Sequence, residues 1–173
     1  MGKSYGGGCR IIMKNGKLDR INLLKYLMVV LLIIYVVFLV TQEGDNTVSV
    51  DTIEKNITKA VKLEGMKKGT TQDLKKYYSL NANDYEGISL YIPDDVMSVN
   101  EILVIKVKNE SQIETVEKAV EIRVNTQEKN FEGYVVEQTK LIHAAIIETR
   151  GRYVLLAVSK DADRIDAAFK KSI

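Results

Sequence analysis

The side chains that could do chemistry in this chain are a few carboxylates, one lysine near them and a single histidine. Glu101 and Lys106 are five positions apart, so in a strand they point to opposite faces and cannot act as a catalytic pair. Either could still be a partly buried charge with a partner elsewhere. His143 is the only histidine, and no Gly-x-Ser-x-Gly motif accompanies it. We therefore expect structural roles here and predict no catalytic residues.

Two acidic pairs and one cysteine bear on metal binding. Asp94-Asp95 follows a predicted strand and Asp161 and Asp163 open a predicted helix, but both pairs lack the ligand spacing and glycine of an EF-hand. Turn and helix-capping roles are expected instead. Cys9 is the only cysteine, which excludes an internal disulfide and a Cys/His zinc site. The sequence predicts no metal and no cofactor.

Polar and aromatic side chains in the C-terminal part have two interpretations each. Arg123 and Gln127 lie four residues apart on a predicted helix and share one face, which is either a polar contact surface or, as we expect, simply the solvated side. Several tyrosines either belong to the core, the expected role, or to an interface. They are Tyr77, Tyr78, Tyr85, Tyr91, Tyr134 and Tyr153.

An apolar, uncharged run from Tyr26 to Val40, extended backwards to Ile21, follows a basic N-terminal segment. No small residues suited to cleavage follow the run, so we expect an uncleaved transmembrane signal-anchor helix over residues 21–41 that holds the protein in the lipid bilayer. Six of the 25 basic residues lie before Tyr26, whereas only one of the 23 acidic residues does. The positive-inside rule then predicts a cytoplasmic tail (1–20), a linker (42–50) and an extracytoplasmic domain (51–173) of a single-pass protein of the cell membrane.

The periodicity of residues 51–173 predicts an α+β domain. Helices are expected from Asp51, from a cap at Thr71, from a capping box at Ser111 and Glu114, and after Asp161. Strands are expected over residues 87–93, 101–108, 143–149 and 152–159, the last two joined by a hairpin at Arg150-Gly151. The order is α-α-β-β-α-β-β-α. It predicts a two-layer fold with a mixed or antiparallel four-stranded sheet and helices on one face.

Two stretches carry a resemblance to a known family. They are "LKKYYSLNANDYEGISLYIPDDVMSVNEILVIKVKN" and "EIRVNTQEKNFEGYVVEQTKLIHAAIIETRGRYVLLAVS", which together cover most of residues 74–159. In them the chain resembles domain-of-unknown-function family 4358, small bacterial proteins with an N-terminal membrane anchor or lipoprotein signal. The resemblance implies a location and a domain boundary, and it implies no activity.

These features favour a binding module over an enzyme. We expect a membrane-tethered extracytoplasmic domain that binds another protein of the bacterial cell envelope. Nucleic acid is not an expected partner, because the C-terminal part carries about three more acidic than basic residues and no basic stripe. The alternative is an envelope hydrolase that uses carboxylates such as Glu101 or Asp94.

Overall fold

The computed structural model describes residues 20–41, 48–133 and 135–173. The chain divides into two compact units, Met1–Gln42 and Glu43–Ile173. Residues 1–19 of the predicted tail (1–20) and most of the predicted linker (42–50) lie outside the described residues. The division into tail, linker and domain stays a prediction, and the two units are described separately below.

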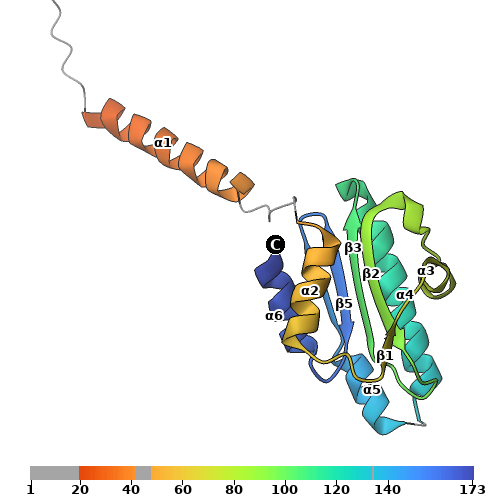
Figure 1. Cartoon of the computed structure of the whole chain (residues 1–173). Coiled ribbons are helices and arrows are strands. Elements are labelled where there is room, and N and C mark those ends of the chain that lie inside the picture. Colours follow the sequence, from red (N-terminus) through yellow and green to blue (C-terminus); the bar gives the residue numbers. More distant parts are fainter. Residues whose placement is uncertain (1–19, 42–47, 134) are drawn as a thin grey trace, which may run out of the picture. The chain divides into compact units, whose positions relative to one another are not determined.

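Helix α1 (Arg20–Thr41) is the only element described in the first unit (Figure 1). Among the described residues, no helix is both long and apolar enough to cross a membrane. This finding contradicts the transmembrane signal-anchor helix predicted over residues 21–41.

The second unit is an α+β domain built on five antiparallel strands, not the predicted four. The strand order is β1-β2-β3-β5-β4. The strands are β1 (Met66–Lys68), β2 (Tyr85–Pro93), β3 (Glu101–Val107), β4 (Ile146–Arg150) and β5 (Tyr153–Val158). The unforeseen strand β1 is the three-residue segment Met-Lys-Lys, which is too short to show alternation. It is held in the sheet by pairing with β2, where Met66 lies opposite Pro93.

Helices cover both faces of the sheet, so the predicted two-layer arrangement with helices on one face is wrong (Figure 1). Helices α2 (Val50–Ala60) and α6 (Ala162–Ser172) pack on one face. Helices α3 (Thr71–Tyr78), α4 (Ile113–Phe131) and α5 (Val136–His143) pack on the other. The physical reason is that every residue of the central strands β3 and β5 is buried. Both of their faces therefore need apolar cover.

Helix boundaries differ from the sequence predictions by one or a few residues, because several polar residues near each end can act as the cap. The cap of α2 is Ser49, whose Oγ accepts a hydrogen bond from the Thr52 amide. Thr70 caps α3 in a capping box with Asp73. Before α4, the capping-box residues are Asn109 and Gln112 around a short 3₁₀ turn, Glu110–Gln112.

His143 ends helix α5 and does not begin a strand. The strand predicted over residues 143–149 is shorter in the structure and begins only at Ile146, the first residue of β4. The residues before it do not join the sheet, because the amides of Ala144 and Ala145 donate to carbonyl oxygens at the end of α5. In the hairpin that follows, Arg150 pairs with Tyr153, so the two turn residues are Gly151 and Arg152. Gly151 has a φ of 50°, a conformation that glycine adopts without steric cost.

Candidate functional site

Glu101 is the first residue of β3 and is completely buried. Because side chains alternate along a strand, it lies on the same face as Leu103 and Ile105, beneath α3 and α4. A buried carboxylate is costly unless charge and hydrogen bonds compensate it. The surroundings of Glu101 therefore define a polar cluster within an otherwise apolar core.

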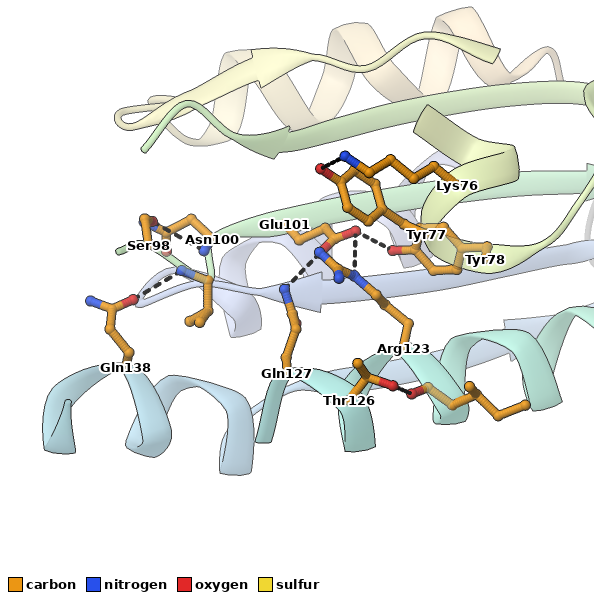
Figure 2. A network of polar contacts seen from close by, with 12 residues as sticks. Lys76, Tyr77, Tyr78, Ser98, Asn100, Glu101, Arg123, Thr126, Gln127 and Gln138 are labelled. Atoms are coloured by element: carbon orange, nitrogen blue, oxygen red, sulfur yellow. Dashed lines mark hydrogen bonds and ion pairs between the residues drawn. The ribbon is translucent and has the colours of Figure 1, made fainter. Parts of the chain in front are cut away.

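Three side chains from two helices saturate the Glu101 carboxylate (Figure 2). Arg123 of α4 donates from Nη2 and Nε to Oε2, at 2.8 and 3.1 Å. Gln127 donates from Nε2 to the same oxygen at 2.8 Å. Tyr78 of α3 donates from its hydroxyl to Oε1 at 2.6 Å. We call Glu101, Arg123, Gln127 and Tyr78 the Glu101 cluster.

The face of α4 that carries Arg123 and Gln127 points into the protein, so the expectation of a solvated face is wrong. Gln127 is 3% exposed, and the Arg123 side chain is 12% exposed. The two residues are one helical turn apart, which lets both reach the same carboxylate. The guanidinium also lies over the ring of Tyr77, 4.4 Å from its centroid.

Tyr78 is a permanent hydrogen-bond donor in this cluster. Two causes raise the pKa of the Tyr78 hydroxyl well above its usual value. Burial is the larger cause, and the adjacent negative charge of Glu101 is the second. The hydroxyl therefore stays protonated at physiological pH and keeps its bond to Oε1. With the guanidinium and amide bonds in place, both oxygens of Glu101 are occupied.

A pocket of about 420 Å³ adjoins the cluster. Arg123 and Gln127 line it together with residues from α3, the end of β2 and the loop after it. The other lining residues are Lys67, Asp73, Lys76, Tyr77, Ile92, Pro93, Asp94, Asp95, Val96, Ser98, Asn130 and Phe131. Oε1 of Gln127 is buried and has no hydrogen-bond partner among the described residues. The pocket thus adjoins a side chain with an unused acceptor.

Lys106 lies on the opposite face of the sheet from Glu101, as the five-residue spacing predicts. It is 3% exposed, and its ammonium is 2.6 Å from Glu86 Oε1 and 5.4 Å from the centroid of the Tyr153 ring. Both charges of β3 are therefore buried with partners elsewhere, as the interpretation of a partly buried charge for these residues expected.

The remaining sequence candidates do not join the Glu101 cluster. His143 is exposed and contacts Glu128, with 2.7 Å between Nε2 and Oε1. Asp95 accepts a hydrogen bond from the Met97 amide in a turn. Asp161 pairs with Arg164 at the start of α6. In the described part of the chain, no three histidine, cysteine or carboxylate side chains gather where they could hold a metal ion.

A second and larger pocket, of about 630 Å³, lies between α2 and α6. Its lining includes Lys59, Arg164 and Lys171 and no carboxylate side chain. Arg164 is already engaged, because it pairs with Asp161 and donates to the carbonyl oxygen of Ala60. The pocket beside the Glu101 cluster is therefore the better candidate site, since it is the one with an unpartnered buried acceptor.

Fold and site together define a small α+β domain, with an antiparallel sheet covered on both faces and a saturated carboxylate beside an open pocket. The chain belongs to the family described as domain of unknown function (DUF4358), which it matches over residues 59–159. All four residues of the Glu101 cluster lie within the match, and the predicted resemblance is confirmed. No curated protein and no solved structure matches the chain.

Proposed function

We propose that residues 48–173 form a non-catalytic interaction domain that docks a protein partner of the cell envelope in the pocket beside the Glu101 cluster. The observation that carries the proposal is the composition of this pocket. It combines an ordered guanidinium, a tyrosine ring and exposed apolar side chains. Tyrosine and arginine are enriched where protein interfaces gain most of their binding energy.

The rim of the pocket supports the same proposal. Val96 lines it and is 90% exposed, and its neighbour Met97 is 57% exposed. Two large apolar side chains on one short loop are costly to leave in water, so a partner that covers them gains free energy. The Glu101 cluster holds Arg123 in place in the same pocket as Val96, which lowers the entropy lost when a partner binds.

The state of the carboxylates supports binding over hydrolysis. A general base needs an oxygen that can take a proton from a water or a substrate. The oxygens of Glu101 are already occupied by Arg123, Gln127 and Tyr78, and Asp94 is exposed in a turn. We therefore propose that the domain is not an enzyme.

Photo-cross-linking in cells tests the proposal. A benzophenone amino acid at Val96 should cross-link one envelope protein, and the same group at Ile122, an exposed apolar position of α4 outside the pocket, should not. Mass spectrometry identifies the partner and the attached peptide, and the purified partner is then titrated against the full chain. Equal cross-linking at both positions, or none at Val96, contradicts the proposal.

The location outside the cytoplasm, at the cell membrane, stays a prediction. Protease added to intact, wall-stripped cells should digest residues 48–173 and spare a cytoplasmic control protein. Survival of the domain while an exported control is digested would place it inside.

A further inference from the structure

The groove between α2 and α6, about 630 Å³ in volume, gathers positive charge (Figure 1). Its lining includes the cations Lys59, Arg164 and Lys171 and no carboxylate side chain. Residues 48–173 as a whole contain no excess of basic over acidic residues. The groove is therefore a local concentration of positive charge, and a concave surface with charge of one sign attracts ligands of the other sign.

Two lysines of the groove have no partner within the described residues. Lys59 of α2 and Lys171 of α6 are exposed, and neither forms a hydrogen bond or an ion pair with the described part of the chain. Lys170, by contrast, lies 2.9 Å from Asp166 Oδ2 and 3.2 Å from Glu148 Oε2. The ammonium groups of the two groove lysines thus keep their hydrogen-bond donors for a ligand.

The positive surface continues beyond the groove. A hollow of about 360 Å³ shares part of its lining with the groove and adds Lys62, which is exposed and has no partner among the residues described. The two carboxylates that line this hollow are already paired. Glu64 Oε2 lies 3.8 Å from Lys160 Nζ, and Asp161 Oδ1 lies 3.2 Å from Arg164 Nη1. Together with the two groove lysines, Lys62 is available to an anionic ligand.

Two hydrogen bonds hold together the helices that form the groove. Asn56 of α2 donates from Nδ2 to Ser172 Oγ of α6 at 3.0 Å. Arg164 of α6 donates from Nη2 to the carbonyl oxygen of Ala60 in α2. Because both bonds cross from one helix to the other, the walls of the groove are in place before a ligand arrives, which lowers the free-energy cost of binding.

The rest of the lining favours one class of anionic ligand. It consists of small and polar residues, without an aromatic or a large apolar side chain: Asn56, Ala60, Ala167, Ala168 and Ser172. Single-stranded nucleic acid is bound largely by stacking of its bases on aromatic rings, and a protein segment by large aromatic and apolar anchors. Phosphate groups need only cations and hydrogen-bond donors, and lysine is a common ligand for them.

The cations are spread along the groove. Arg164 and Lys171 are seven residues apart on α6, which corresponds to about 10 Å along the helix axis, and Lys59 belongs to the other wall. A chain of phosphate groups that lies along the groove meets the cations of both walls one after another. A single phosphate ion uses only part of this row, and a flat lipid surface meets only the rims of the groove.

We infer that the groove between α2 and α6 binds an anionic polymer with phosphate groups in its backbone, held by Lys59, Lys62 and Lys171. This site goes beyond the proposed docking of a protein partner. It lies on the opposite face of the sheet from the pocket beside the Glu101 cluster, because α2 and α6 cover one face and α3, α4 and α5 the other. The two proposals therefore stand or fall separately.

Titration with a phosphate chain tests the inference. End-labelled linear polyphosphate is titrated with the full chain by fluorescence anisotropy, at salt concentrations from about 50 to 200 mM. The logarithm of the association constant for a flexible phosphate chain falls against the logarithm of the salt concentration with a slope of about −0.7 per contacting cation. Three lysines predict a slope of about −2. Inorganic phosphate at the same total phosphate concentration should compete far more weakly than unlabelled polyphosphate.

A pair of double variants separates the groove from the overall charge. Lys59→Gln/Lys171→Gln should weaken binding about tenfold at about 50 mM salt and reduce the slope to about −0.7. Lys75→Gln/Lys118→Gln, at exposed positions of α3 and α4 on the other face, removes the same charge and should change the affinity by less than about twofold. All four lysines are exposed, and thermal melting checks that both variants are folded.

Mapping on the unchanged protein needs no variant. Unlabelled polyphosphate added to the ¹⁵N-labelled full chain should shift the amide signals of Ala60, Ala167 and Ala168. Several outcomes overturn the inference. They are no binding, equal losses in the two double variants, shifts confined to the pocket beside the Glu101 cluster, binding of poly-L-glutamate or oligothymidylate as tight as that of polyphosphate, and binding of phosphatidylglycerol vesicles in place of polyphosphate. The Val96 cross-link measures the proposed function independently of all of these.

Discussion

Removal of the Arg123 guanidinium is the sharpest test of the Glu101 cluster. Arg123→Met keeps most of the apolar volume but takes away the only cation that contacts Glu101 in the described part of the chain. Glu101, which is 0% exposed, would retain the Tyr78 hydroxyl and the Gln127 amide as donors without a countercharge. An uncompensated buried charge of this kind costs about 3–5 kcal/mol.

That loss is large beside a typical domain stability of about 5–15 kcal/mol. Urea denaturation of the full chain at pH 7, followed by far-UV circular dichroism, measures it as a shift of the midpoint. The control is Arg150→Met, which removes an exposed arginine whose Nε lies 3.7 Å from Oε1 of Glu148. An exposed pair of this kind contributes at most about 1 kcal/mol.

A double variant separates the charge from the packing. Glu101→Gln in the Arg123→Met background removes the unpaired charge and keeps an acceptor for Tyr78. It should recover about half of the lost stability or more, because the single change is costly mainly through the buried charge. A loss below about 1 kcal/mol for Arg123→Met, or no recovery in the double variant, would refute the assignment of a compensated buried carboxylate.

Three further predictions follow from burial and charge. Leu155→Asp puts an unpaired charge at a fully buried position of β5 and should cost several kcal/mol, enough to unfold or nearly unfold the domain in a denaturation experiment. His143→Ala should lower the free energy of unfolding, measured by urea denaturation, by no more than about 1 kcal/mol, because the histidine is exposed and loses only its contact with Glu128. Burial opposes ionisation of Glu54, but hydrogen bonds from partners such as Lys68 outweigh it and lower the pKa of the carboxyl below 4.5. Since the folded pKa is the lower one, Glu54 contributes stability above about pH 4.5 that is lost as the pH falls. Glu54→Gln should therefore flatten the decline of the urea midpoint between about pH 5 and 3, and an unchanged decline would contradict this assignment.

The sequence located the elements whose signal is local. The nearly continuous apolar run "ILVIKV" and the run "YVLLAV" became the central strands β3 and β5, since such runs bounded by turn residues predict buried strands. Thr70 and Ser49 replaced the predicted caps at neighbouring positions. Both kinds of signal depend on residues within a few positions of each other, and such signals are visible in one sequence.

The number of layers could also have been read from the sequence. A strand that is apolar at successive positions, such as Ile102–Ile105, must be covered on both faces, and this requirement already conflicts with helices on one face only. Strand β1 was beyond sequence reasoning, because Met66–Lys68 is a strand only through its pairing with β2. Its position depends on a partner about 25 residues away along the chain, which local periodicity does not reveal.

The sequence by itself determined that Glu101 and Lys106 point to opposite faces, because alternation along a strand is a property of the backbone. It also carried an unused signal, an isolated Glu at the start of an apolar strand and an Arg and a Gln four residues apart on a helix. Only the tertiary structure decided that Arg123, Gln127 and Tyr78 converge on Glu101. Their meeting depends on how α3 and α4 pack against β3, and the free energy of a buried charge depends on all of its neighbours together.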